Sequence, residues 1–488
     1  MAQDRPVGIA QLVTNGAARD PSRTAMVDAD TRLSWRELDS AVAGAARALR
    51  AAGAVAGDRV ALELGTGVPF AVLYLGALRA GLIAVPLNPA YTAAEIDYIL
   101  RDSGAALYLT AAAARELLAA APHSGSPADL PAERGGGAVS VLLYTSGTSG
   151  RPKGAMLSAQ ALLANVDQLA AVEPPVLRAD DVLFVPLPLC HVFGLNAGLG
   201  MSLRVGATIV LADRFDAAAT LATMAAERVS VVLGVPGQYA QWLQQPGVGA
   251  GFASVRFAMS GSATLPYAVV QGFARLGVVL HDGYGLTEAA PVVTMNAIGA
   301  GSGPPKPGSI GVALPGVEVE LRDADGEPTG PEDPGRVFVR GANLFSGYWP
   351  DGSGGPDADG WFGTGDIAVT DADGELHLVG RSAELVIVNG FNVYPAEVEA
   401  VLAALPGVGE VAVVGVADQR SGEAVRAYVV PAGQAVLDPD ELLAAAARSL
   451  AHFKLPRDIE IVSQLPRTAT GKIMKWQLRA AERDDGSS

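Results

Sequence analysis

Two hydrophobic periods alternate along the first part of the chain. Residues 37–52 place apolar side chains at helical spacing, and residues 59–64 form a short β-branched run. This alternation continues to about residue 110 and is typical of parallel α/β units. Residues 121–137 are rich in Pro, Gly and Ser and predict a surface loop, after which residues 139–143 predict a buried strand.

A second series of the same kind extends from residue 158 to about residue 284. It includes a predicted helix over 217–227, with Asp216 as its N-cap, followed by a strand over 229–235. We therefore expect two similar α/β lobes, each built on an open sheet.

The pattern changes after the Gly/Pro-rich segment 299–309. Residues 310–379 show short alternating strands separated by turn dipeptides such as those at 325–326 and 373–374, which are both Asp-Gly. These features predict a small β-rich subdomain.

Another change follows Gly380 and Arg381. The remaining residues, about 105, predict a separate α+β domain of ordinary size. Its expected elements are strands over 385–388, 411–416 and 424–430 and helices over 395–404 and 439–449. The prediction is an α/β fold with a large domain at 1–381, holding the two lobes and the β-rich subdomain, and a small α+β domain at 382–488.

Composition and charge narrow the class of protein. The composition, 50% hydrophobic and 18% charged, is typical of a folded protein. A chain of 488 residues is too long for a single hydrophobic core. The net charge of -16 opposes nucleic acid or an anionic membrane as the main partner, because both would repel the protein. Residues 451–480 carry six basic and two acidic side chains, and this local excess suits a small polyanionic ligand.

The cysteine count and the apolar segments indicate the cellular compartment in which the protein is expected. Cys190 is the single cysteine, so an intramolecular disulfide is excluded and a reducing compartment fits. The first residues lack the basic and apolar parts of a signal peptide. The most apolar early stretch, 71–87, is interrupted by Gly76, Arg79 and Gly81, so a bilayer-spanning helix of about 20 apolar residues is not expected there. We expect a soluble, cytoplasmic protein, and the sequence leaves its oligomeric state open.

A segment rich in glycine and hydroxyl groups follows the predicted strand 139–143. Its sequence is YTSGTSGRPKG (144–154). Gly147 and Gly150 allow backbone amides to approach phosphate oxygens, and Lys153 can supply positive charge. The hydroxyl groups that can donate to the same oxygens belong to Thr145, Ser146, Thr148 and Ser149. The loop differs from a Walker A loop, since proline precedes the lysine and glycine follows it. We interpret it as a phosphate cradle, although an unliganded flexible loop has the same composition.

This loop resembles the ATP phosphate loop of the adenylate-forming superfamily, which comprises acyl-CoA synthetases, non-ribosomal peptide adenylation domains and firefly luciferase. The resemblance extends over nearly the whole chain, because further motifs of that family stand in the expected order. They are YGLTE at 284–288, GTGD at 363–366, GR at 380–381, NGFNVYPAEVE at 389–399 and PRTATGK at 466–472. The run at 284–296 is most similar to bacterial fatty acyl-CoA synthetases.

The resemblance implies an ATP-dependent reaction in two steps with Mg²⁺ and CoA as cofactors. A carboxylic acid attacks the α-phosphate of ATP, and the acyl group of the resulting acyl-adenylate passes to CoA after the small domain rotates. Bringing two anions together requires the site to neutralise growing negative charge. Lys472 would be the adenylation lysine, Thr287 would contact the α-phosphate, and Glu288 would hold Mg²⁺.

The same resemblance implies further contacts. Thr148 would join Glu288 at the metal, and Asp366 and Arg381 would contact the ribose. The other nucleotide-binding residues implied, besides the phosphate loop, are Ser262, Ala263, Asp282, Gly283, Tyr284, Gly285, Gly390 and Phe391.

The acyl site is implied to lie between the segments 188–196, 234–239, 259–263 and 283–292. Its residues would be His191 at the carboxylate and, around the acyl group, Val192, Phe193, Val235, Met259, Gly261, Gly283 and Val292. The four segments contain no Arg or Lys, which disfavours a dicarboxylic acid because a second buried carboxylate needs a cationic partner. Residues 187–194 lack the Asp that pairs with an α-amine in amino-acid-activating relatives. We therefore expect an apolar monocarboxylic acid, medium- or long-chain aliphatic or aryl.

The acceptor and the hinge are less constrained by the sequence. Few residues follow Lys475, so we expect free CoA rather than a fused carrier protein. The alternatives are a stand-alone acyl-AMP ligase that loads a separate carrier protein, an aryl-CoA ligase, a non-catalytic nucleotide sensor and, most distantly, a luciferase-like oxygenase.

The resemblance also places a hinge between the two domains at Ala383. Relatives usually have a charged Asp or Lys at this position. Alternatively, Ala383 is an ordinary linker residue and Glu384 provides the exposed charged side chain.

Overall fold

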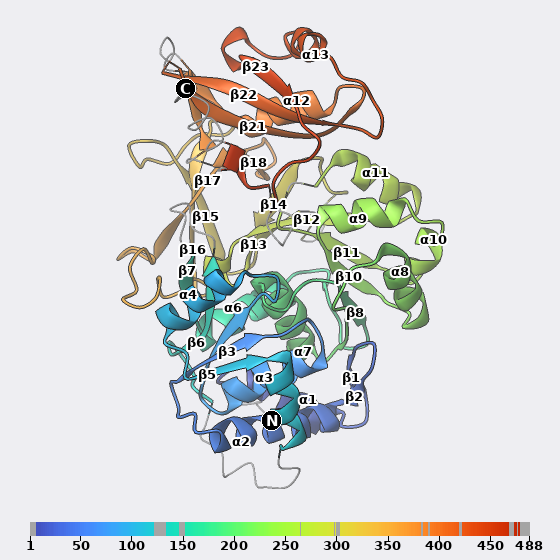
Figure 1. The fold of residues 1–488 in the computed structure, drawn as a ribbon, viewed down its shortest axis with the longest axis vertical. Coiled ribbons are helices and arrows are strands. Elements are labelled where there is room, and N and C mark those ends of the chain that lie inside the picture. Colours follow the sequence, from blue (N-terminus) through green and yellow to red (C-terminus); the bar gives the residue numbers. More distant parts are fainter. Residues whose placement is uncertain are drawn as a thin grey trace. The chain divides into compact units, whose positions relative to one another are not determined.

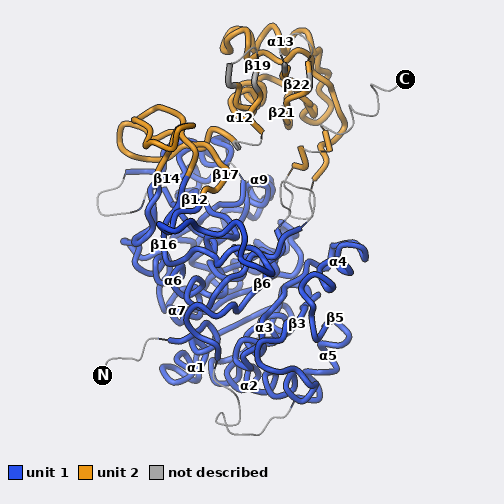
Figure 2. Tube along the Cα trace, turned by 90° about the vertical axis from the view of Figure 1, so that its left-hand side faces the viewer, with its two compact units in different colours: residues 1–319, 338–362 blue, residues 320–337, 363–488 orange. Residues whose placement is uncertain are grey.

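The computed structural model describes residues 6–121, 133–145, 152–263, 265–296, 298, 303–381, 384–388, 391–418, 422–467, 473–475 and 477–478. The chain divides into two compact units, coloured separately in Figure 2. Unit 1 comprises residues 1–319 and 338–362, and unit 2 comprises residues 320–337 and 363–488. The predicted boundary between residues 381 and 382 stays a prediction, because residues 382 and 383 lie outside the described part.

The first lobe of unit 1 is a five-stranded sheet in the order β5-β3-β4-β6-β7 (Figure 1). Its strands are β3 (Arg59–Glu63), β4 (Ile83–Leu87), β5 (Leu107–Thr110), β6 (Val139–Thr145) and β7 (Lys153–Ser158). All pairs are parallel except β6–β7, which is antiparallel. The helices from the first part of the chain are α1 (Ile9–Arg19), α2 (Trp35–Ala51), α3 (Val68–Arg79), α4 (Ala93–Ser103) and α5 (Ala111–Ala119).

The start of α2 follows from its sequence. Ser34 accepts a hydrogen bond from the Glu37 amide, and the Glu37 carboxylate accepts one from the Ser34 amide at 2.8 Å. This capping box satisfies two backbone donors that a helix start otherwise leaves unpaired. The helix predicted at 37–52 therefore begins two residues earlier, at Trp35.

The second lobe contains a longer run of paired strands in the order β14-β13-β12-β11-β10-β8-β9-β1-β2. Their bounds are β1 (Thr24–Val27), β2 (Arg32–Ser34), β8 (Val182–Val185), β9 (Thr208–Leu211), β10 (Val231–Gly234), β11 (Phe257–Ser260), β12 (Leu280–Gly285), β13 (Val292–Met295) and β14 (Ser309–Ala313). Strands β8 to β12 pair in parallel, whereas β12–β13 and β13–β14 are antiparallel. The helical elements are α6 (Ala159–Ala170), η2 (Phe193–Gly200), α7 (Met201–Val205), α8 (Ala217–Ala226), α9 (Pro236–Leu243), α10 (Val248–Gly251), α11 (Tyr267–Arg275) and η3 (Thr287–Ala289).

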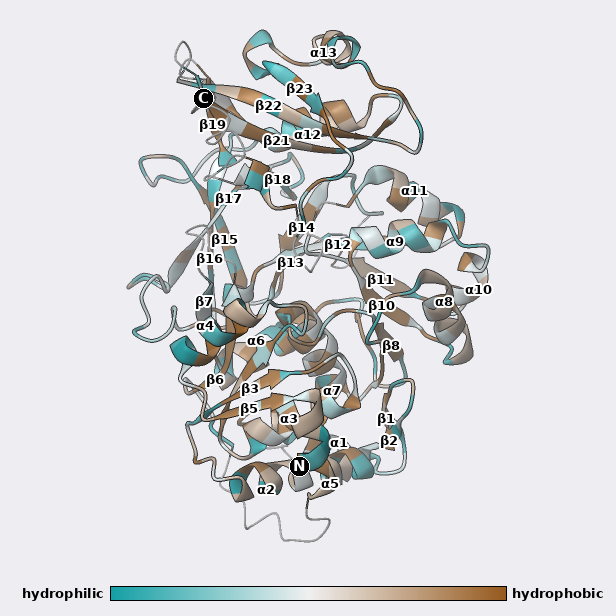
Figure 3. Ribbon diagram, in the orientation of Figure 1, coloured by the Kyte–Doolittle hydropathy of each residue, from teal (hydrophilic) through white to brown (hydrophobic). Residues whose placement is uncertain are grey.

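One face of β10 and β11 packs on an aromatic core. Val232 and Ala258 lie in a buried cluster with Tyr239, Trp242 and other side chains of α8, α9 and α11. The rings of Tyr239 and Trp242 pack edge to face at a centroid separation of 5.2 Å. Because neighbouring residues of a strand point to opposite faces, Val231, Leu233, Phe257 and Met259 point the other way. The apolar character of these strands is visible as brown ribbon in Figure 3.

The predicted helix and strand at 217–235 are confirmed with small shifts. Asp216 caps α8 by accepting from the Ala219 amide at 2.8 Å.

The π-helix η2 is an element that the sequence did not predict. Its sequence FGLNAGLG is buried throughout, and the Asn196 side chain donates to the carbonyls of Leu162 and Ala290 at 3.0 and 2.7 Å. These two bonds hold η2 between α6 and the turn that follows η3.

Unit 2 contains the end of the β-rich segment and an α+β sheet. The β-rich strands are β15 (Val317–Arg322), β16 (Gly335–Gly341) and β17 (Trp361–Thr370), which cross the unit boundaries, and β18 (Leu376–Arg381). The C-terminal sheet has the order β20-β19-β22-β21, with β23 paired in parallel to β22. Its elements are β19 (Val386–Val388), β20 (Phe391–Val393), α12 (Pro395–Ala403), β21 (Val408–Asp418), β22 (Gly422–Pro431), α13 (Pro439–Ala446), η5 (His452–Lys454) and β23 (Asp458–Ile461).

The predicted turns and the fold class agree with this architecture. In both predicted Asp-Gly turns an upstream aspartate, Asp323 or Asp371, accepts from two backbone amides, and Gly326 and Gly374 have φ of 91° and 84°. The α/β class, with two lobes, a β-rich segment and an α+β C-terminal part, is confirmed. Among the described residues, no helix combines the length and the apolar character that crossing a membrane requires.

Candidate active site

Apart from the phosphate loop, the predicted nucleotide residues of unit 1 lie on β12 or just after β11: Asp282, Gly283, Tyr284 and Gly285, and Ser262 and Ala263. These strands run in parallel, with Ser260 opposite Asp282, so the residues that follow each strand share one edge of the sheet. Ser262 and Ala263 are exposed just after β11, and Ser262 has a φ of 72°. Ligands of open α/β sheets bind at this carboxyl edge. The sequence motifs therefore coincide with the edge at which the fold favours ligand binding.

The two glycines of strand β12 have different neighbours. A Cβ on Gly285 would lie 2.2 Å from the Pro291 carbonyl oxygen, which is backbone, so a side chain there would displace the start of β13. A Cβ on Gly283 would lie 2.2 Å from the Met259 methyl carbon, the movable end of a flexible side chain, and 3.3 Å from the Thr294 carbonyl oxygen. Glycine at these positions lets β12 and β13 approach closely.

Asp282 is a buried carboxyl group at this edge. Its Oδ1 accepts from the Gly283 amide at 3.0 Å, while its own amide donates to Asn296 Oδ1 at 2.9 Å. Burial raises the pKa of Asp282 to about 7 despite the backbone hydrogen bonds, which lower it. The side chain can therefore exchange a proton near neutral pH at a position predicted to contact the nucleotide.

The predicted metal ligand Glu288 lies beside the predicted phosphate loop. Tyr348 connects them, because its hydroxyl donates to Glu288 Oε1 at 2.6 Å and its ring lies 5.3 Å from the Lys153 ammonium. Burial and the Glu288 carboxylate both raise the pKa of Tyr348, which keeps the hydroxyl a donor. Thr287 and Glu288 themselves belong to η3 and are half-buried.

Tyr348 is a site residue that sequence reasoning missed. The segment around it runs along β7: Met156 donates to the Gly347 carbonyl at 3.1 Å, and Trp349 donates to the Gly154 carbonyl at 2.8 Å. No periodicity at 346–349 indicates this pairing, since the segment is joined to β7 only through the fold. The pairing places a phenol between a carboxylate and a lysine that are 135 residues apart in sequence.

Part of the phosphate cradle cannot be placed. Thr145 ends β6 and Lys153 begins β7, and these two residues face each other in the antiparallel pair. Ser146, Gly147, Thr148, Ser149 and Gly150 lie outside the described residues, as do Lys472, Ala383 and Gly390. Their predicted roles stay predictions.

Several predicted acyl-site residues are close neighbours. A Cβ added to Gly261 would lie 3.2 Å from the Phe193 ring and 3.5 Å from the Gly283 carbonyl oxygen. Met259 reaches Gly283 as described above. Val192 and Val292 are buried, and Val235 is half-buried at the start of α9. The structure thus brings Phe193, Met259, Gly261 and Gly283 together.

His191 is the titratable residue among these positions. The residue is half-buried, and its Nε2 is enclosed without a hydrogen-bond partner among the described residues. Burial lowers the pKa of His191 to about 4, so the ring is neutral at physiological pH. A neutral imidazole with an unused nitrogen can form a hydrogen bond to a ligand but supplies no positive charge.

In unit 2, the two predicted ribose contacts are opposite each other in one hairpin. Asp366 on β17 is the antiparallel partner of Arg381 on β18. Asp366 is buried, and its amide donates to Thr364 Oγ1 at 3.1 Å. Phe391 begins β20. The sequence spacing of the GTGD and GR motifs therefore corresponds to a cross-strand pair.

A half-buried ion-pair cluster in unit 2 joins the end of the 389–399 motif to residues that follow the 380–381 and 466–472 motifs. Lys475 Nζ lies 3.0 Å from Glu384 Oε2 and 2.8 Å from Glu399 Oε1, and Glu399 also accepts from the Val413 amide at 2.7 Å. Burial alone would lower the pKa of Lys475, but the two carboxylates outweigh it and raise the pKa. The side chains of Lys475 and Glu384 are thus engaged with each other and partly shielded from solvent. We call these three residues the Lys475 cluster.

Comparison with known proteins agrees with this geometry. The family model "AMP-binding enzyme" matches residues 13–349, and the model "AMP-binding enzyme C-terminal domain" matches residues 397–472. A feruloyl-CoA synthase of Amycolatopsis sp is 38% identical over 97% of this chain and 99% of its own length. A long-chain-fatty-acid–CoA ligase of Bacillus subtilis is 31% identical over 97% of this chain and 94% of its own length. The ATP-bound crystal structure of MatB from Rhodopseudomonas palustris superimposes with a TM-score of 0.89 at 33% identity, covering 98% of this chain and 99% of that one.

The chain belongs to the AMP-binding enzyme family, within the adenylate-forming superfamily. The relatives that match along nearly their whole length are CoA ligases. The protein is accordingly an AMP-forming acid–thiol ligase, an acyl-CoA synthetase that uses ATP and CoA, and the resemblance found in the sequence is confirmed.

The neutral state of His191 leads to a test by pH. The ratio of kcat/KM between wild type and His191→Asn should stay constant from pH 5 to 8, because the imidazole takes up a proton only near pH 4. His191→Leu should lose about two- to tenfold relative to wild type, the value of one net hydrogen bond. A ratio that changes between pH 6 and 7 would show that the charged imidazole takes part.

The Lys475 cluster predicts coupling between the predicted hinge and Lys472, the predicted adenylation lysine. Glu384 follows the predicted hinge residue directly, and Lys475 lies three residues after Lys472. Lys475→Met leaves two half-buried carboxylates without their cation, so the segment that carries Lys472 should shift. Because a 1 Å misplacement can cost about 10²-fold in rate, we expect acid-dependent ATP–pyrophosphate exchange to fall by about 10- to 100-fold.

Arg426→Met is the matched control for that experiment. Arg426 forms a comparable ion pair with Asp458 at 2.7 Å in the same sheet, away from both motifs. Its loss should lower the melting temperature similarly while exchange stays within about threefold of wild type. Equal loss of exchange in both variants would mean that the Lys475 cluster only stabilises the fold.

Proposed function

We propose that this acyl-CoA synthetase activates an apolar monocarboxylic acid, a medium- or long-chain fatty acid, and transfers the acyl group to free CoA. The observation that carries the proposal is the character of the acyl site. Phe193, Met259, Gly261 and Gly283 offer an apolar surface, and His191, the titratable group among the predicted acyl-site residues, is neutral. Such a surface favours a hydrocarbon group by burial and gives no counter-charge to a second carboxylate.

The residues of unit 1 support the adenylation step. Glu288 is half-buried and oriented by Tyr348, and one or two carboxylates are what Mg²⁺ usually takes from a protein. Bound there, Mg²⁺ would supply positive charge to the phosphate oxygens. Lys153, held beside Tyr348, lies at the end of the predicted phosphate cradle and can contribute charge from the protein. Lys472 would add a further positive charge, which would neutralise the negative charge that develops on the phosphate oxygens as the acid attacks.

An aryl acid is the second candidate, favoured by one observation. The Amycolatopsis relative, which is 38% identical along the chain, is a feruloyl-CoA synthase. A separate carrier protein remains the alternative acceptor to CoA.

Pyrophosphate release over a panel of acids, with and without CoA, tests the substrate class. The panel comprises butanoate, octanoate, dodecanoate, ferulate, malonate and alanine. We expect octanoate to exceed butanoate, since each buried methylene contributes about 0.8 kcal/mol until the site is filled. Ferulate above octanoate would select the aryl candidate, and malonate or alanine above octanoate would reject both. Formation of the thioester only with a carrier protein would reject CoA as the acceptor.

Lys472→Ala tests the division of the reaction into two steps. Loss of one charge-stabilising donor typically costs on the order of 10²–10³ in rate, and we expect that loss in acyl-adenylate formation. Transfer from pre-made acyl-adenylate to CoA should stay within about tenfold of wild type, because that step no longer develops charge at the α-phosphate. An equal loss in both half-reactions would contradict the role assigned to Lys472.

A further inference from the structure

Tyr348 in unit 1 contacts two opposite charges at once. Its hydroxyl group donates to Glu288 Oε1 at 2.6 Å, and its ring centroid lies 5.3 Å from the Lys153 ammonium, within cation–π distance. The phenol itself is neutral, because burial and the Glu288 carboxylate raise its pKa. One uncharged side chain therefore binds a carboxylate through its hydroxyl group and a cation through its ring face.

The fold holds this ring in place independently of the two charges. The Tyr348 amide donates to the Ser353 carbonyl at 2.9 Å, and the Tyr348 carbonyl accepts from the Gly352 amide at 2.8 Å. The Phe345 ring packs edge to face against the phenol, with the two centroids 5.0 Å apart. Backbone hydrogen bonds and aromatic packing thus fix the position of Tyr348.

The two charged residues differ in how firmly they are held. Glu288 is half-buried, and its carbonyl accepts from the Phe345 amide at 2.8 Å. Lys153 is exposed at the first position of β7, and its four-carbon stem is flexible. A mobile ammonium within reach of a carboxylate is attracted to it, and contact would neutralise both charges. Here Tyr348 contacts both groups and provides the separation.

An ion pair between these two groups would remove the charge that each needs for its predicted ligand. Lys153 is predicted to bind the anionic phosphate oxygens of ATP, and Glu288 is predicted to bind the cation Mg²⁺. A group that is already paired within the protein has to lose that partner before it binds a ligand. The apparent affinity therefore falls in proportion to the fraction of unpaired protein.

We propose that Tyr348 is a spacer, which prevents Lys153 and Glu288 from pairing with each other and so keeps both charges available for ATP and its metal ion. The inference rests on the part of the proposed function that assigns Lys153 to phosphate and Glu288 to Mg²⁺. Tyr348 is a positioning residue and takes no part in bond formation. Its ring provides the separation and its hydroxyl group orients the carboxylate, so the two effects can be measured apart.

Binding of ADP without Mg²⁺, measured by calorimetry at low ionic strength, tests the spacer. Screening is weak under these conditions. Lys153→Met should reduce the affinity for ADP about 10- to 100-fold, the value of a charge-assisted hydrogen bond. Tyr348→Ala should reduce it about three- to tenfold, because Lys153 then pairs with Glu288. Tyr348→Phe keeps the ring and should stay within about twofold of wild type.

Glu288→Gln identifies the cause of the loss in Tyr348→Ala. The amide carries no charge to pair with Lys153, so this substitution should raise ADP affinity about three- to tenfold more in Tyr348→Ala than in wild type. An equal gain in both backgrounds overturns the spacer and leaves the assigned roles of Lys153 and Glu288 intact. Undiminished ADP affinity in Tyr348→Ala overturns it too, as does a loss in Tyr348→Phe as large as that in Tyr348→Ala.

Trp349→Ala is the matched control for damage to the segment. Trp349 is half-buried like its neighbour, and its indole donates to the Asp102 carbonyl at 2.9 Å. Glu288→Gln should change ADP affinity in this variant as it does in wild type, and an extra gain like that in Tyr348→Ala would overturn the spacer. Should Tyr348→Ala fail to fold, Tyr348→Val replaces it in the same cycle. Unchanged ADP affinity in Lys153→Met would contradict the assignment of Lys153 to phosphate, and the spacer with it, while the acid panel still decides the substrate class.

Discussion

The close approach of β12 and the start of β13 is the constraint on which the site of unit 1 depends. A Cβ on Gly285 would lie 2.2 Å from the Pro291 carbonyl oxygen, and one on Gly283 would lie 3.3 Å from the Thr294 carbonyl oxygen. With these backbones so near one another, the chain leaves β12 at a fixed place and turns through η3, which carries Thr287 and Glu288. A side chain at Gly285 would therefore move the predicted phosphate contact and the predicted metal ligand together.

The contacts around η3 then extend this order to the rest of the unit. Phe345 donates to the Glu288 carbonyl at 2.8 Å, and Tyr348 donates to the Glu288 side chain. The segment that carries these two aromatic residues pairs with β7, whose first residue is Lys153. Backbone hydrogen bonds, rather than flexible surface ion pairs, therefore set the spacing between the carboxylate and the lysine. Preorganisation of this kind avoids reorganisation during the reaction.

The sequence was informative where function depends on local patterns. The helix cap at Asp216, the Asp-Gly turns and the two lobes follow from short-range chemistry, and motif order identified the family. What the sequence could not give depends on distant contacts. Tyr348 becomes a site residue only because 346–349 pairs with β7, and η2 is helical despite its glycines because it is buried and held by Asn196. Likewise the sequence does not indicate that Lys475 pairs with Glu384 and Glu399, because these residues are far from it along the chain.

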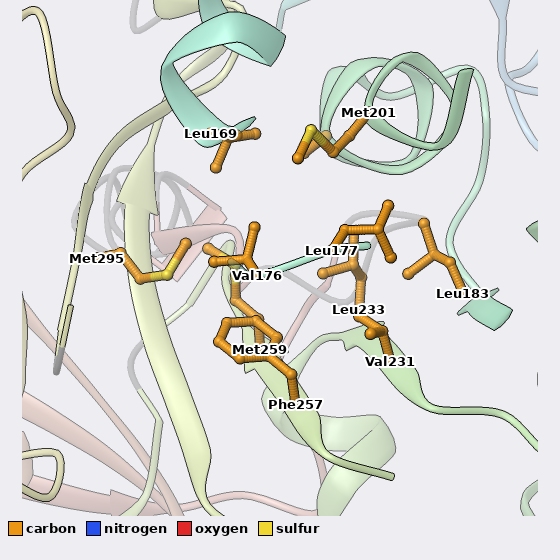
Figure 4. A pocket seen from close by; sticks show the side chains of 11 residues that line it. Leu169, Val176, Leu177, Leu183, Met201, Val231, Leu233, Phe257, Met259 and Met295 are labelled. Atoms are coloured by element: carbon orange, nitrogen blue, oxygen red, sulfur yellow. The ribbon is translucent and has the colours of Figure 1, made fainter. Parts of the chain in front are cut away.

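Three methionines, Met201, Met259 and Met295, line an apolar space in unit 1 (Figure 4). Under the proposed function, these side chains have a consequence for the breadth of substrates. A site that rejects competitors through unpaired hydrogen-bonding groups can discriminate strongly, whereas an apolar wall distinguishes neighbouring homologues by only about 1–3 kcal/mol per methylene. Adaptable walls weaken even that discrimination, because they repack around chains of different length. The proposed enzyme would then sort acids by an upper limit of length and not by identity, and the mixture of thioesters it makes would follow the mixture of acids supplied to it.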